Sequence, residues 1–358
     1  MYIQKTVYND NMRVVEDPNQ IIKELRTGKL NDEIRFRTPQ SSLSIKYKNV
    51  MTLFNEMEPS FLNLADGSII TLFDKTPLPI NENDVVCPHF VELKWANGCK
   101  FNCSWCYLNG TFRFRPMGKK PYLKDIEKIR EHLNNYFNQV HSPTILNSGE
   151  LSDSLVFEGN GNALSKLIIP MFKTQDTHKL LILTKSSKVS GIEKSKSQAQ
   201  VIVSFSLNSF EVAKRWEKGA PSPKQRIKAA KKLYDSSYEV RVRLDPIIPV
   251  ENWKDEYKQV IDHLFENLTP ERISLGSLRG LQSTINNSRD RSWVPYLDET
   301  SNWGKKISFG KRSEMYKFIK GYLEEEYDFK KIGLCKETVG MWGELGMDYR
   351  EIKCNCIF

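Results

Sequence analysis

The sequence contains no long hydrophobic run, and none of its apolar stretches approaches the roughly 20 residues that a membrane-spanning helix needs. Residues 1–18, MYIQKTVYNDNMRVVEDP, also lack the apolar core of a secretory signal. We therefore expect no membrane partner and a cytoplasmic location, where cellular reductants keep most thiols reduced. In that compartment, clustered cysteines more often bind metal or take part in catalysis than form disulfides.

Internal repeats and low-complexity segments are absent as well. The 358 residues are 39% hydrophobic and 11% aromatic, which is typical of a globular protein that buries a substantial core. This length suits one large domain with appendages, or two domains of medium size.

The chain carries an excess of positive charge, with 53 Lys and Arg against 44 Asp and Glu and a formal net charge of +9. The basic residues gather at 113–124, 185–196 and 214–232. Such patches can neutralise phosphates and raise the affinity for nucleic acids, but they can equally be solvated helix faces. Charge alone therefore does not identify the partner.

Residues 1–89 differ from the rest of the chain. Short apolar pieces at 2–9, 43–54 and 67–73 are separated by polar turns. This pattern predicts an N-terminal extension made of a few short strands and loops.

From residue 90 to residue 280, apolar strand-like runs alternate with helical patterns, which predicts six βα-type units. Connections of this kind are nearly always right-handed, so the strands should be parallel with the helices outside. Six units are too few for a closed eight-stranded barrel, and the first turn lacks the glycine-rich loop of a doubly wound sheet. We therefore predict an α/β fold, a partial (β/α)6 TIM-type barrel. The expected strands are 90–96, 144–149, 179–185, 200–208, 239–248 and 272–278, and the expected helices are 122–137, 163–172, 222–237 and 253–268.

Residues 281–358 form the third expected region, a C-terminal extension. It begins with a polar stretch, continues with a helix expected at 311–326, and ends in a tail that contains Cys335, Cys354 and Cys356. These cysteines make the extension a candidate metal-binding region.

Three of the seven cysteines lie in one short loop, GCKFNCSWCY at 98–107, directly after the first strand of the expected barrel. Cys99, Cys103 and Cys106 form a C-x3-C-x2-C motif. A thioredoxin-like motif would use only the last two, and a zinc site usually takes four ligands as two separated pairs. Three thiolates in one loop can instead hold three corners of a [4Fe–4S] cube and leave the fourth iron open. A structural zinc site completed by a distant ligand is the main alternative.

This spacing, with an aromatic residue before the last cysteine, resembles the signature of the radical S-adenosylmethionine (SAM) enzymes. The resemblance implies that SAM binds the open iron and that one electron cleaves it to methionine and a 5′-deoxyadenosyl radical, which abstracts hydrogen from a C–H bond. It also implies a partial (β/α)6 barrel and an external one-electron reductant of the flavodoxin or ferredoxin type. The protein would hold, orient and shield the reacting groups.

Five further segments are similar to the strand-end motifs of the spore photoproduct lyase-like group of that superfamily. They span about residues 91–280 in the expected order and read CSWCYLN, NSGELSDSL, LILTKSS, VSFSLNS and RVRLDPIIP. The tail LCKETVGMWGELGMDYREIKCNC also resembles C-terminal ends found in this group. The resemblance implies a nucleic-acid or nucleotide substrate that is repaired or modified.

The resemblance also assigns roles to individual residues. Trp105 would lie near the adenine of SAM, and Tyr107 stands where the lyases have a tyrosine that relays hydrogen atoms. Gly149 and Glu150 end the second strand, where the methionine amino group is usually bound. The other cofactor-binding candidates follow the second strand or end later strands; they are Ser152, Asp153, Lys185, Ser206, Asn208 and Arg243.

Lys185 is expected to pair with the SAM carboxylate, a role that suits the point charge of lysine. Plainer interpretations exist for several of these residues. The serines could cap helices, the two cations could be surface charges, the tyrosine could be core packing, and an aspartate before proline could fix a turn; these residues are Ser152, Ser206, Lys185, Arg243, Tyr107 and Asp245.

One position departs from the lyase pattern. The lyases carry a cysteine just ahead of the Ser-Asp pair, and it returns a hydrogen atom to the product radical, but Glu150 stands there in this chain. Trp105 likewise replaces the second tyrosine of the lyase relay. The departure predicts a different radical fate, so the chain is assigned to the wider group, with Tyr107 and Glu150 as candidate catalytic residues.

The other cysteines are Cys87, Cys335, Cys354 and Cys356. Three interpretations compete: an auxiliary iron–sulfur cluster or zinc site, a thiol hydrogen donor in place of the missing one, and ordinary buried or surface thiols.

Three functions compete in the same way. The first is a radical SAM enzyme acting on a nucleic acid or nucleotide. The second is a radical SAM enzyme acting on a small molecule or peptide, which the missing donor cysteine favours. The third is a non-catalytic, metal-stabilised nucleic-acid-binding protein, which would not cleave SAM.

Overall fold

The computed structural model describes residues 12–30, 32–52, 56–73, 76, 78–351 and 353–358. The apolar piece expected at 2–9 lies outside these residues. Each described helix is too short or too polar to span a bilayer.

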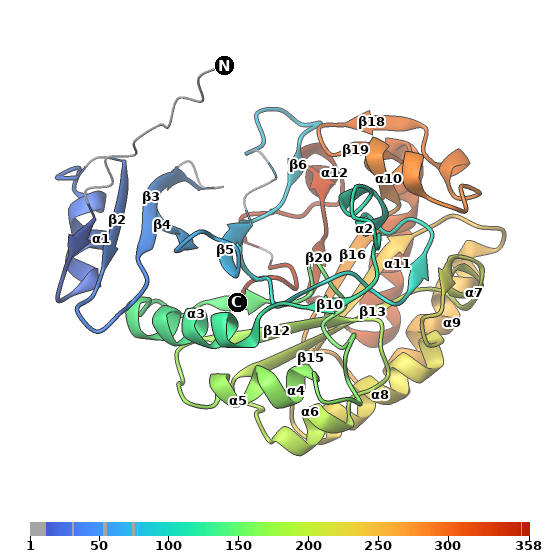
Figure 1. Ribbon diagram of the computed structural model, residues 1–358. Coiled ribbons are helices and arrows are strands. Elements are labelled where there is room, and N and C mark those ends of the chain that lie inside the picture. Colours follow the sequence, from blue (N-terminus) through green and yellow to red (C-terminus); the bar gives the residue numbers. More distant parts are fainter. Residues whose placement is uncertain (1–11, 31, 53–55, 74–75, 77, 352) are drawn as a thin grey trace.

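A run of seven parallel strands forms the centre of the molecule, and neighbours in the sheet follow one another along the chain (Figure 1). The first six are the strands expected from the sequence. In order, the strands are β7 (Phe90–Leu93), β11 (Ile145–Asn147), β12 (Lys179–Thr184), β13 (Val201–Leu207), β15 (Glu239–Ile247), β16 (Ile273–Ser277) and β20 (Ile332–Leu334). Every residue of β13 and β16 is buried, as in parallel sheets covered on both faces.

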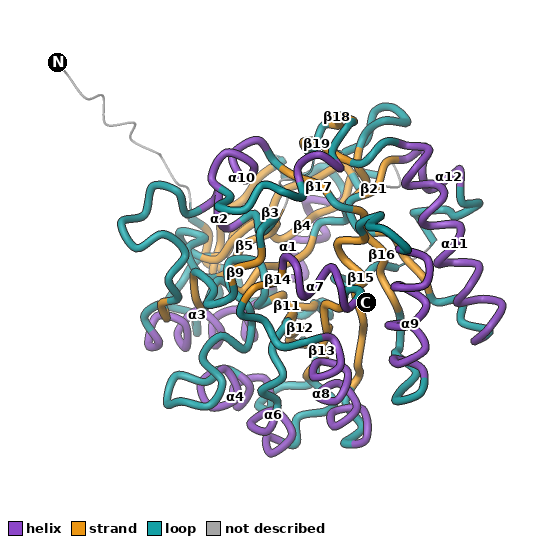
Figure 2. The backbone as a smooth tube through the Cα atoms, turned by 90° about the vertical axis from the view of Figure 1, so that its right-hand side faces the viewer, coloured by secondary structure: helices purple, strands orange, loops and turns teal. Residues whose placement is uncertain are grey.

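Helices follow these strands and lie on the outside of the sheet (Figure 2). They bury apolar stripes against the strands, as amphipathic helices do. The helix expected at 222–237 is capped by Ser222, which forms a reciprocal capping box with Gln225, and Pro223 is its first residue. The helices are α3 (Ile126–Gln139), α4 (Leu164–Leu167), α5 (Ile169–Phe172), α6 (Ser190–Ser195), α7 (Phe210–Trp216), α8 (Pro223–Asp235), α9 (Trp253–Phe265) and α11 (Phe309–Tyr327).

The helix predicted at 163–172 is divided into α4 and α5. Pro170 lies at the start of α5 and has no N–H to donate to the preceding turn. A proline is tolerated in a first turn but not inside a helix, so the pattern supports two short helices in place of one.

The N-terminal residues form short strands, as predicted, and these strands join the same sheet. The antiparallel strands β2 to β5 add to its first edge, and β5 pairs with β7 through Ile70 and Leu93. In Figure 1 this extension lies to the left of the barrel. Its elements are β1 (Arg13–Val14), α1 (Pro18–Arg26), β2 (Glu33–Arg37), β3 (Ile45–Met51), β4 (Met57–Leu64) and β5 (Ile70–Phe73). The division of the chain at residues 89 and 280 stays a prediction.

The C-terminal region contributes a small three-stranded sheet, the predicted helix and the unpredicted strand β20. The remaining elements are β6 (Val85–Val86), β8 (Ala96–Asn97), β9 (Asn102–Cys103), α2 (Leu108–Thr111), β10 (Tyr122–Leu123), β14 (Glu217–Lys218), β17 (Arg279–Gly280), α10 (Gln282–Asn287), η1 (Val294–Tyr296), β18 (Glu299–Ser301), β19 (Gly304–Lys306), β21 (Glu337–Thr338) and α12 (Val339–Glu344).

The last residues of the chain lie inside the barrel. Asn355 is 1% exposed, and its side chain bonds Ser204, Ser274 and the carbonyl of Val242, which belong to three different strands. Arg241 and Arg272 donate to carbonyls of the same segment. The tail therefore fills the interior of the partial barrel and is held there by buried polar contacts.

Candidate active site

One cavity of about 400 Å³ lies at the carboxyl ends of the parallel strands, where barrels of this type bind their ligands. All seven cysteines of the chain line it. The loop cysteines and the tail cysteines are far apart in the sequence, but they line the same cavity.

The cysteine loop is built on tight backbone contacts. Gly98 begins it with φ +87°, and a Cβ there would stand 2.6 Å from the carbonyl oxygens of Lys119 and Lys120. A side chain is excluded on both counts. The loop then pairs with β14, placing Cys103 opposite Glu217. These contacts hold the loop rigidly against the barrel.

Two of the three loop thiols, Cys99 and Cys103, are protonated when no metal is bound. Burial raises the pKa of Cys99 above its usual range and that of Cys103 to about 12. Bound metal would displace these protons, because thiolates rather than thiols are the ligands.

A [4Fe–4S] cube binds its thiolates on separate irons, so Cys99, Cys103 and Cys106 can each take one corner and leave the fourth iron open. Within the residues that the structure describes, no group of three or more His, Cys, Asp or Glu side chains forms a ready site for a single metal ion.

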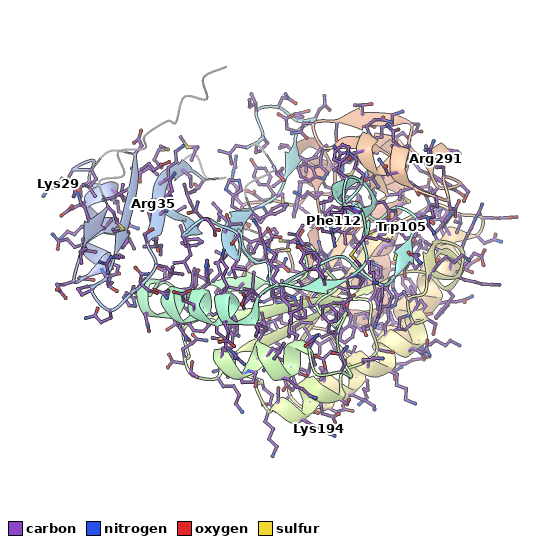
Figure 3. The ribbon with its side chains drawn as sticks, viewed as in Figure 1. Lys29, Arg35, Trp105, Phe112, Lys194 and Arg291 are labelled. Atoms are coloured by element: carbon purple, nitrogen blue, oxygen red, sulfur yellow. The ribbon has the colours of Figure 1, made fainter. Side chains whose placement is uncertain are left out.

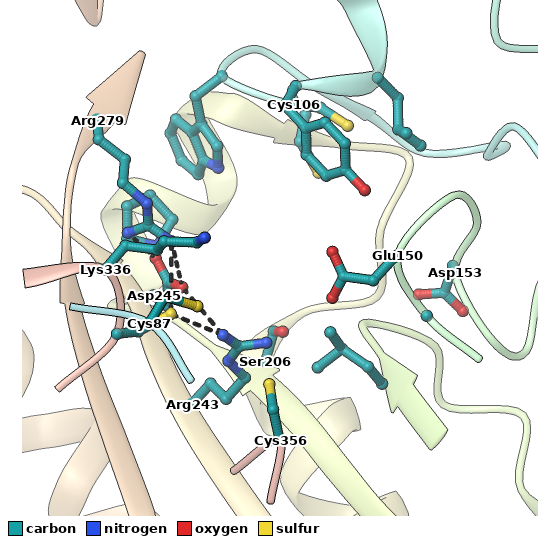
Figure 4. Close-up of a pocket in the computed structure, with 18 of the residues that line it drawn as sticks. Cys87, Cys106, Glu150, Asp153, Ser206, Arg243, Asp245, Arg279, Lys336 and Cys356 are labelled. Carbon is teal, nitrogen blue, oxygen red and sulfur yellow. Dashed lines mark hydrogen bonds and ion pairs between the residues drawn. The ribbon is translucent and has the colours of Figure 1, made fainter. Parts of the chain in front are cut away.

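Glu150 reaches into the cavity from the loop after β11 (Figure 4). The side chain of Asn147 orients this loop, donating to Glu150 Oε1 at 3.0 Å and accepting from the Gly149 amide at 2.9 Å. Gly149 also lines the cavity, and a Cβ at that position would stand 2.5 Å from Leu183. Gly149 is therefore needed because this turn packs closely against Leu183 of β12.

Ser152 and Asp153 follow in the same turn and line the cavity. Asp153 accepts from the amides of Lys185 and Leu155 at 2.8 and 2.9 Å and from Thr184 Oγ1 at 2.7 Å. It thus ties the turn after β11 to the end of β12. Burial nevertheless raises the pKa of this carboxyl above its ordinary value. Ser152 does not cap a helix; it donates to the carbonyl of Asp153.

Lys185 lines the cavity at the end of β12, and its ammonium group lies 3.6 Å from Glu217 Oε1. Glu217 also pairs with Arg226 at 2.5 Å, and both of those side chains are fully buried. Burial alone would raise the pKa of Glu217, but Arg226 and Lys185 hold it below its ordinary value. Lys185 is therefore an oriented charge with 18% of its side chain exposed, and the surface-charge interpretation is wrong.

Arg243 ends β15 and contacts the tail. It donates to Cys335 Sγ at 2.7 Å and lies 3.8 Å from Asp245, whose two oxygens accept from Arg279 at 3.0 and 2.9 Å. Burial alone would raise the pKa of Asp245, but the two arginines hold it below its ordinary range. Figure 4 shows this cluster on the wall that faces Cys106 and Glu150. Arg243, whose side chain is 11% exposed, thus belongs to an ion-pair network that lines the cavity and is not a surface charge.

The predicted residues Trp105, Tyr107 and Ser206 also line the cavity. Trp105 packs edge-on against Trp216, with ring centroids 5.9 Å apart. Tyr107 has 39% of its surface exposed, so it is not ordinary core packing. Ser206 lies within β13 and caps no helix.

Asn208 is a correction to the predicted set, because it does not line the cavity. Its amide donates to the carbonyl of Pro246 at 2.8 Å, and its oxygen accepts from Tyr257 at 2.8 Å and from the amide of Ser209 at 2.9 Å. It is fully buried and joins the ends of β13 and β15. Asn208 directly follows a strand end, which is why it was predicted to bind the cofactor, but its side chain points away from the cavity.

Three residues of the site were missed. Arg279 follows directly after the last predicted strand, so its position was a usable signal. Glu217 offers none, because only the pairing of β14 with β9 brings it to the loop. Lys336 stacks over Trp303, with its ammonium 3.8 Å from the ring centroid, and both line the cavity from the C-terminal region.

Comparison with known proteins finds one family over the barrel. The family model "Spore photoproduct lyase" matches residues 90–277. Among curated relatives, the spore photoproduct lyase of Clostridium acetobutylicum is 26% identical over 51% of this chain and 54% of its own length. That of Bacillus subtilis is 28% identical over 49% of this chain and 50% of its own length. The chain thus spans about half the length of the curated relatives it matches.

Solved structures show the same fold. A spore photoproduct lyase complexed with dinucleoside spore photoproduct aligns with a TM-score of 0.58 at 18% identity, over 68% of this chain and 75% of that one. A mutant lyase with bound AdoMet and dinucleoside spore photoproduct aligns with a TM-score of 0.58 at 16% identity, over 90% of this chain and 96% of that one. Together with the parallel strands described above, these alignments show the partial TIM-type barrel.

Proposed function

Because this chain belongs to the spore photoproduct lyase family, a group of radical SAM enzymes, we propose that it cleaves SAM reductively and abstracts hydrogen from a nucleic-acid or nucleotide substrate. The observation that carries the proposal is the shared cavity: the three loop cysteines face the same chamber as Gly149, Glu150 and Lys185. A structural zinc site needs only its ligands, and it would not require Gly149, Glu150 and Lys185 to lie beside the three cysteines.

Cys99, Cys103 and Cys106 would hold the [4Fe–4S] cluster. When bound, the cluster and SAM supply a 5′-deoxyadenosyl radical, and the electron comes from an external reductant of the flavodoxin or ferredoxin type. The protein's own share is binding, orientation and exclusion of water. The walls of the cavity shield the reacting groups from water. Its free thiols are consistent with a cytoplasmic location, where cellular reductants keep thiols reduced.

The cavity walls divide the remaining tasks. Gly149 lets the turn after β11 pack closely against β12, and Glu150 offers a carboxylate to an ammonium group. Lys185, oriented by Glu217, offers the opposite charge to a carboxylate. SAM carries both groups on its methionine end, so the two residues would fix that end, while Trp105 covers the adenine.

The first test of the proposal is anaerobic. We expect protein reconstituted with iron and sulfide to form 5′-deoxyadenosine when SAM and dithionite are added, as measured by mass spectrometry. The variant Cys99→Ala/Cys103→Ala/Cys106→Ala should form none above background, because a SAM molecule without the open iron has no route to the electron.

The control is a change outside the cavity. Lys194→Ala on α6 should leave the nucleoside at the wild-type level. If the wild-type protein binds iron or zinc and never forms 5′-deoxyadenosine, the proposed function is wrong.

A nucleic-acid substrate is supported by the segment that follows the cysteine loop. Its aromatic rings are interleaved with cations: Arg113 lies 4.2 Å from the ring of Phe114, and Arg115 lies 4.6 Å from the rings of both Phe112 and Tyr122. Phe114 is 83% exposed. Exposed aromatics beside cations are the means by which proteins bind single strands, through stacking and phosphate contacts. The lyase structures above contain a dinucleoside, which is consistent with this substrate class.

We expect binding of a fluorescent single-stranded DNA oligonucleotide to weaken steeply with salt. Arg113→Ala/Arg115→Ala should reduce the slope of log K against log salt by about 1 to 2, since each lost phosphate contact removes about 0.7 to 1. Fluorescence anisotropy at several salt concentrations measures the slope.

The control for this experiment is Lys194→Ala, a change in another basic segment. Lys194 lies on α6, and Figure 3 shows it at the far edge of the molecule from Trp105 and Phe112. It should leave the slope unchanged. Binding that does not depend on salt would contradict a polymer substrate.

A small molecule or peptide is the second candidate substrate, and Glu150 is the observation that favours it. A carboxylate faces the cavity where the lyases have their hydrogen-donating cysteine. A carboxylate can bind a cationic group but is a poor donor of hydrogen atoms. The substrate class that accelerates 5′-deoxyadenosine formation decides between the two candidates.

A further inference from the structure

Four cysteines outside the loop converge on the wall of the cavity opposite to it. β6 pairs with β21, which brings Cys87 beside the segment that contains Cys335. Cys354 and Cys356 arrive from the tail, and all four thiols line the cavity. Figure 4 shows Cys87 and Cys356 near Arg243, with Cys106 across the opening. Three segments far apart in the chain therefore deliver four thiols to one place.

The tail that carries two of these thiols is held firmly. Asn355, between Cys354 and Cys356, makes four side-chain or backbone hydrogen bonds with β13, β15 and β16 at 2.8 to 3.0 Å. Arg241 donates to the carbonyls of the two residues that flank Cys356, at 2.9 Å to Asn355 and 2.7 Å to Ile357. Satisfied buried networks of this kind fix a single geometry. The thiols of Cys354 and Cys356 are therefore held in fixed positions by the hydrogen bonds of the tail.

The charge around the four thiols is positive. Arg243 donates to Cys335 Sγ at 2.7 Å and Arg279 lies 3.6 Å from the same sulfur, while Asp245 is the acidic partner that they share. The Nε of Arg243 is buried and has no hydrogen-bond partner among the described residues. The two arginine side chains are only 11% and 20% exposed, so neutral thiols beside them would leave part of their positive charge uncompensated. Thiolates bound to metal would supply the missing negative charge, and N–H donors to sulfur are a known means of tuning iron–sulfur centres.

We propose that Cys87, Cys335, Cys354 and Cys356 hold a second [4Fe–4S] cluster. Four thiolates leave none of its irons open, so it is not a second SAM site. The arginine N–H donors beside Cys335 Sγ favour an iron–sulfur cluster over a zinc ion, because donors of this kind tune such centres. The proposal does not depend on SAM cleavage, and its test does not measure it.

The test is the iron and acid-labile sulfide content of protein reconstituted without oxygen. We expect about eight irons per chain in the wild type, the content of two four-iron clusters. The tail variant Cys354→Ser/Cys356→Ser should retain about four, and so should the loop variant Cys99→Ala/Cys103→Ala/Cys106→Ala. The loop variant does not change the tail, so the iron that it retains shows whether a second cluster is present even if the tail variant fails to fold.

Electron paramagnetic resonance after reduction provides a second readout. The cluster that remains in the loop variant should give a signal that added SAM does not alter, because it has no open iron. The cluster in the tail variant should respond to SAM. A wild type with about four irons, all lost in the loop variant, would overturn the proposal, and so would zinc in place of iron at the tail site.

Discussion

Replacing Glu337 with alanine is expected to lower the free energy of unfolding by about 3–5 kcal/mol, the range for removing one partner of a buried ion pair. Glu337 is fully buried on β21 and lies between two cations that are also fully buried, Lys306 at 3.3 Å and Arg312. It also accepts from Ser277 Oγ at 2.7 Å and Tyr316 Oη at 2.8 Å. Its loss leaves two charges and two hydroxyl groups without their common partner.

The neighbours of Glu337 limit how much the free energy of unfolding can decrease. Burial already lowers the pKa of Lys306 to about 8, so this residue can release its proton when the carboxylate is gone. Arg312 cannot, but it keeps an ion pair with Glu299 at 2.7 Å and a bond to the carbonyl of Ile307. The cost should therefore stay near a few kcal/mol and not unfold the chain outright.

Urea unfolding followed by tryptophan fluorescence measures this change as a shift of the midpoint at constant slope. The control is Asp235→Ala, which removes an exposed i,i+4 pair with Lys231 and should change stability by no more than about 0.5 kcal/mol. Equal effects of the two variants would contradict the assigned role of Glu337.

The same carboxylate makes stability depend on pH. Burial opposes its ionisation, but Lys306 and Arg312 hold the pKa of Glu337 below its ordinary value. Its contribution is therefore complete above the unfolded pKa of about 4.3 and is lost as the pH falls through the lower folded value. Glu337→Gln should lack this part of the acid sensitivity.

Glu217→Gln is expected to cost a similar amount, about 3–5 kcal/mol, because Arg226 would stay buried without a counter-charge. The double variant Glu217→Leu/Arg226→Met should recover part of that loss, since a buried pair replaced by apolar residues is often neutral. Urea midpoints of the wild type, the single variant and the double variant give the comparison. A double variant less stable than the single one would contradict the ion-pair account.

The strands of the barrel could be predicted because each is an apolar run bounded by polar turns. The candidate site followed from the resemblance to the lyase-like group, and the strand pattern agrees with it. Parallel strands end at one edge, and Gly149, Lys185 and Arg243 each stand at such an end. Strand β20 was not predicted, because a glycine stands at the centre of its three residues and weakens the apolar signal of a strand. Glu217 and the shared chamber of the cysteines depend on contacts between distant segments, and no local pattern in the sequence encodes those.

The position of Asn208 illustrates the limit of strand-end reasoning. A residue at a strand end lies near the ligand, but which way its side chain points depends on its partners. Here Tyr257 and Pro246 turn the amide inward. The sequence offers the position but not the orientation.

The buried tail also imposes an order on assembly. Residues 354–356 are synthesised after every strand of the barrel that they fill, so Ser204, Ser274 and the carbonyl of Val242 wait for Asn355 to reach them. Until then these polar groups must be hydrated, because buried ones need partners. Cys354 and Cys356 reach the cavity only when this segment has docked. Any metal that they bind together with Cys87 and Cys335 would therefore be bound at or after that step.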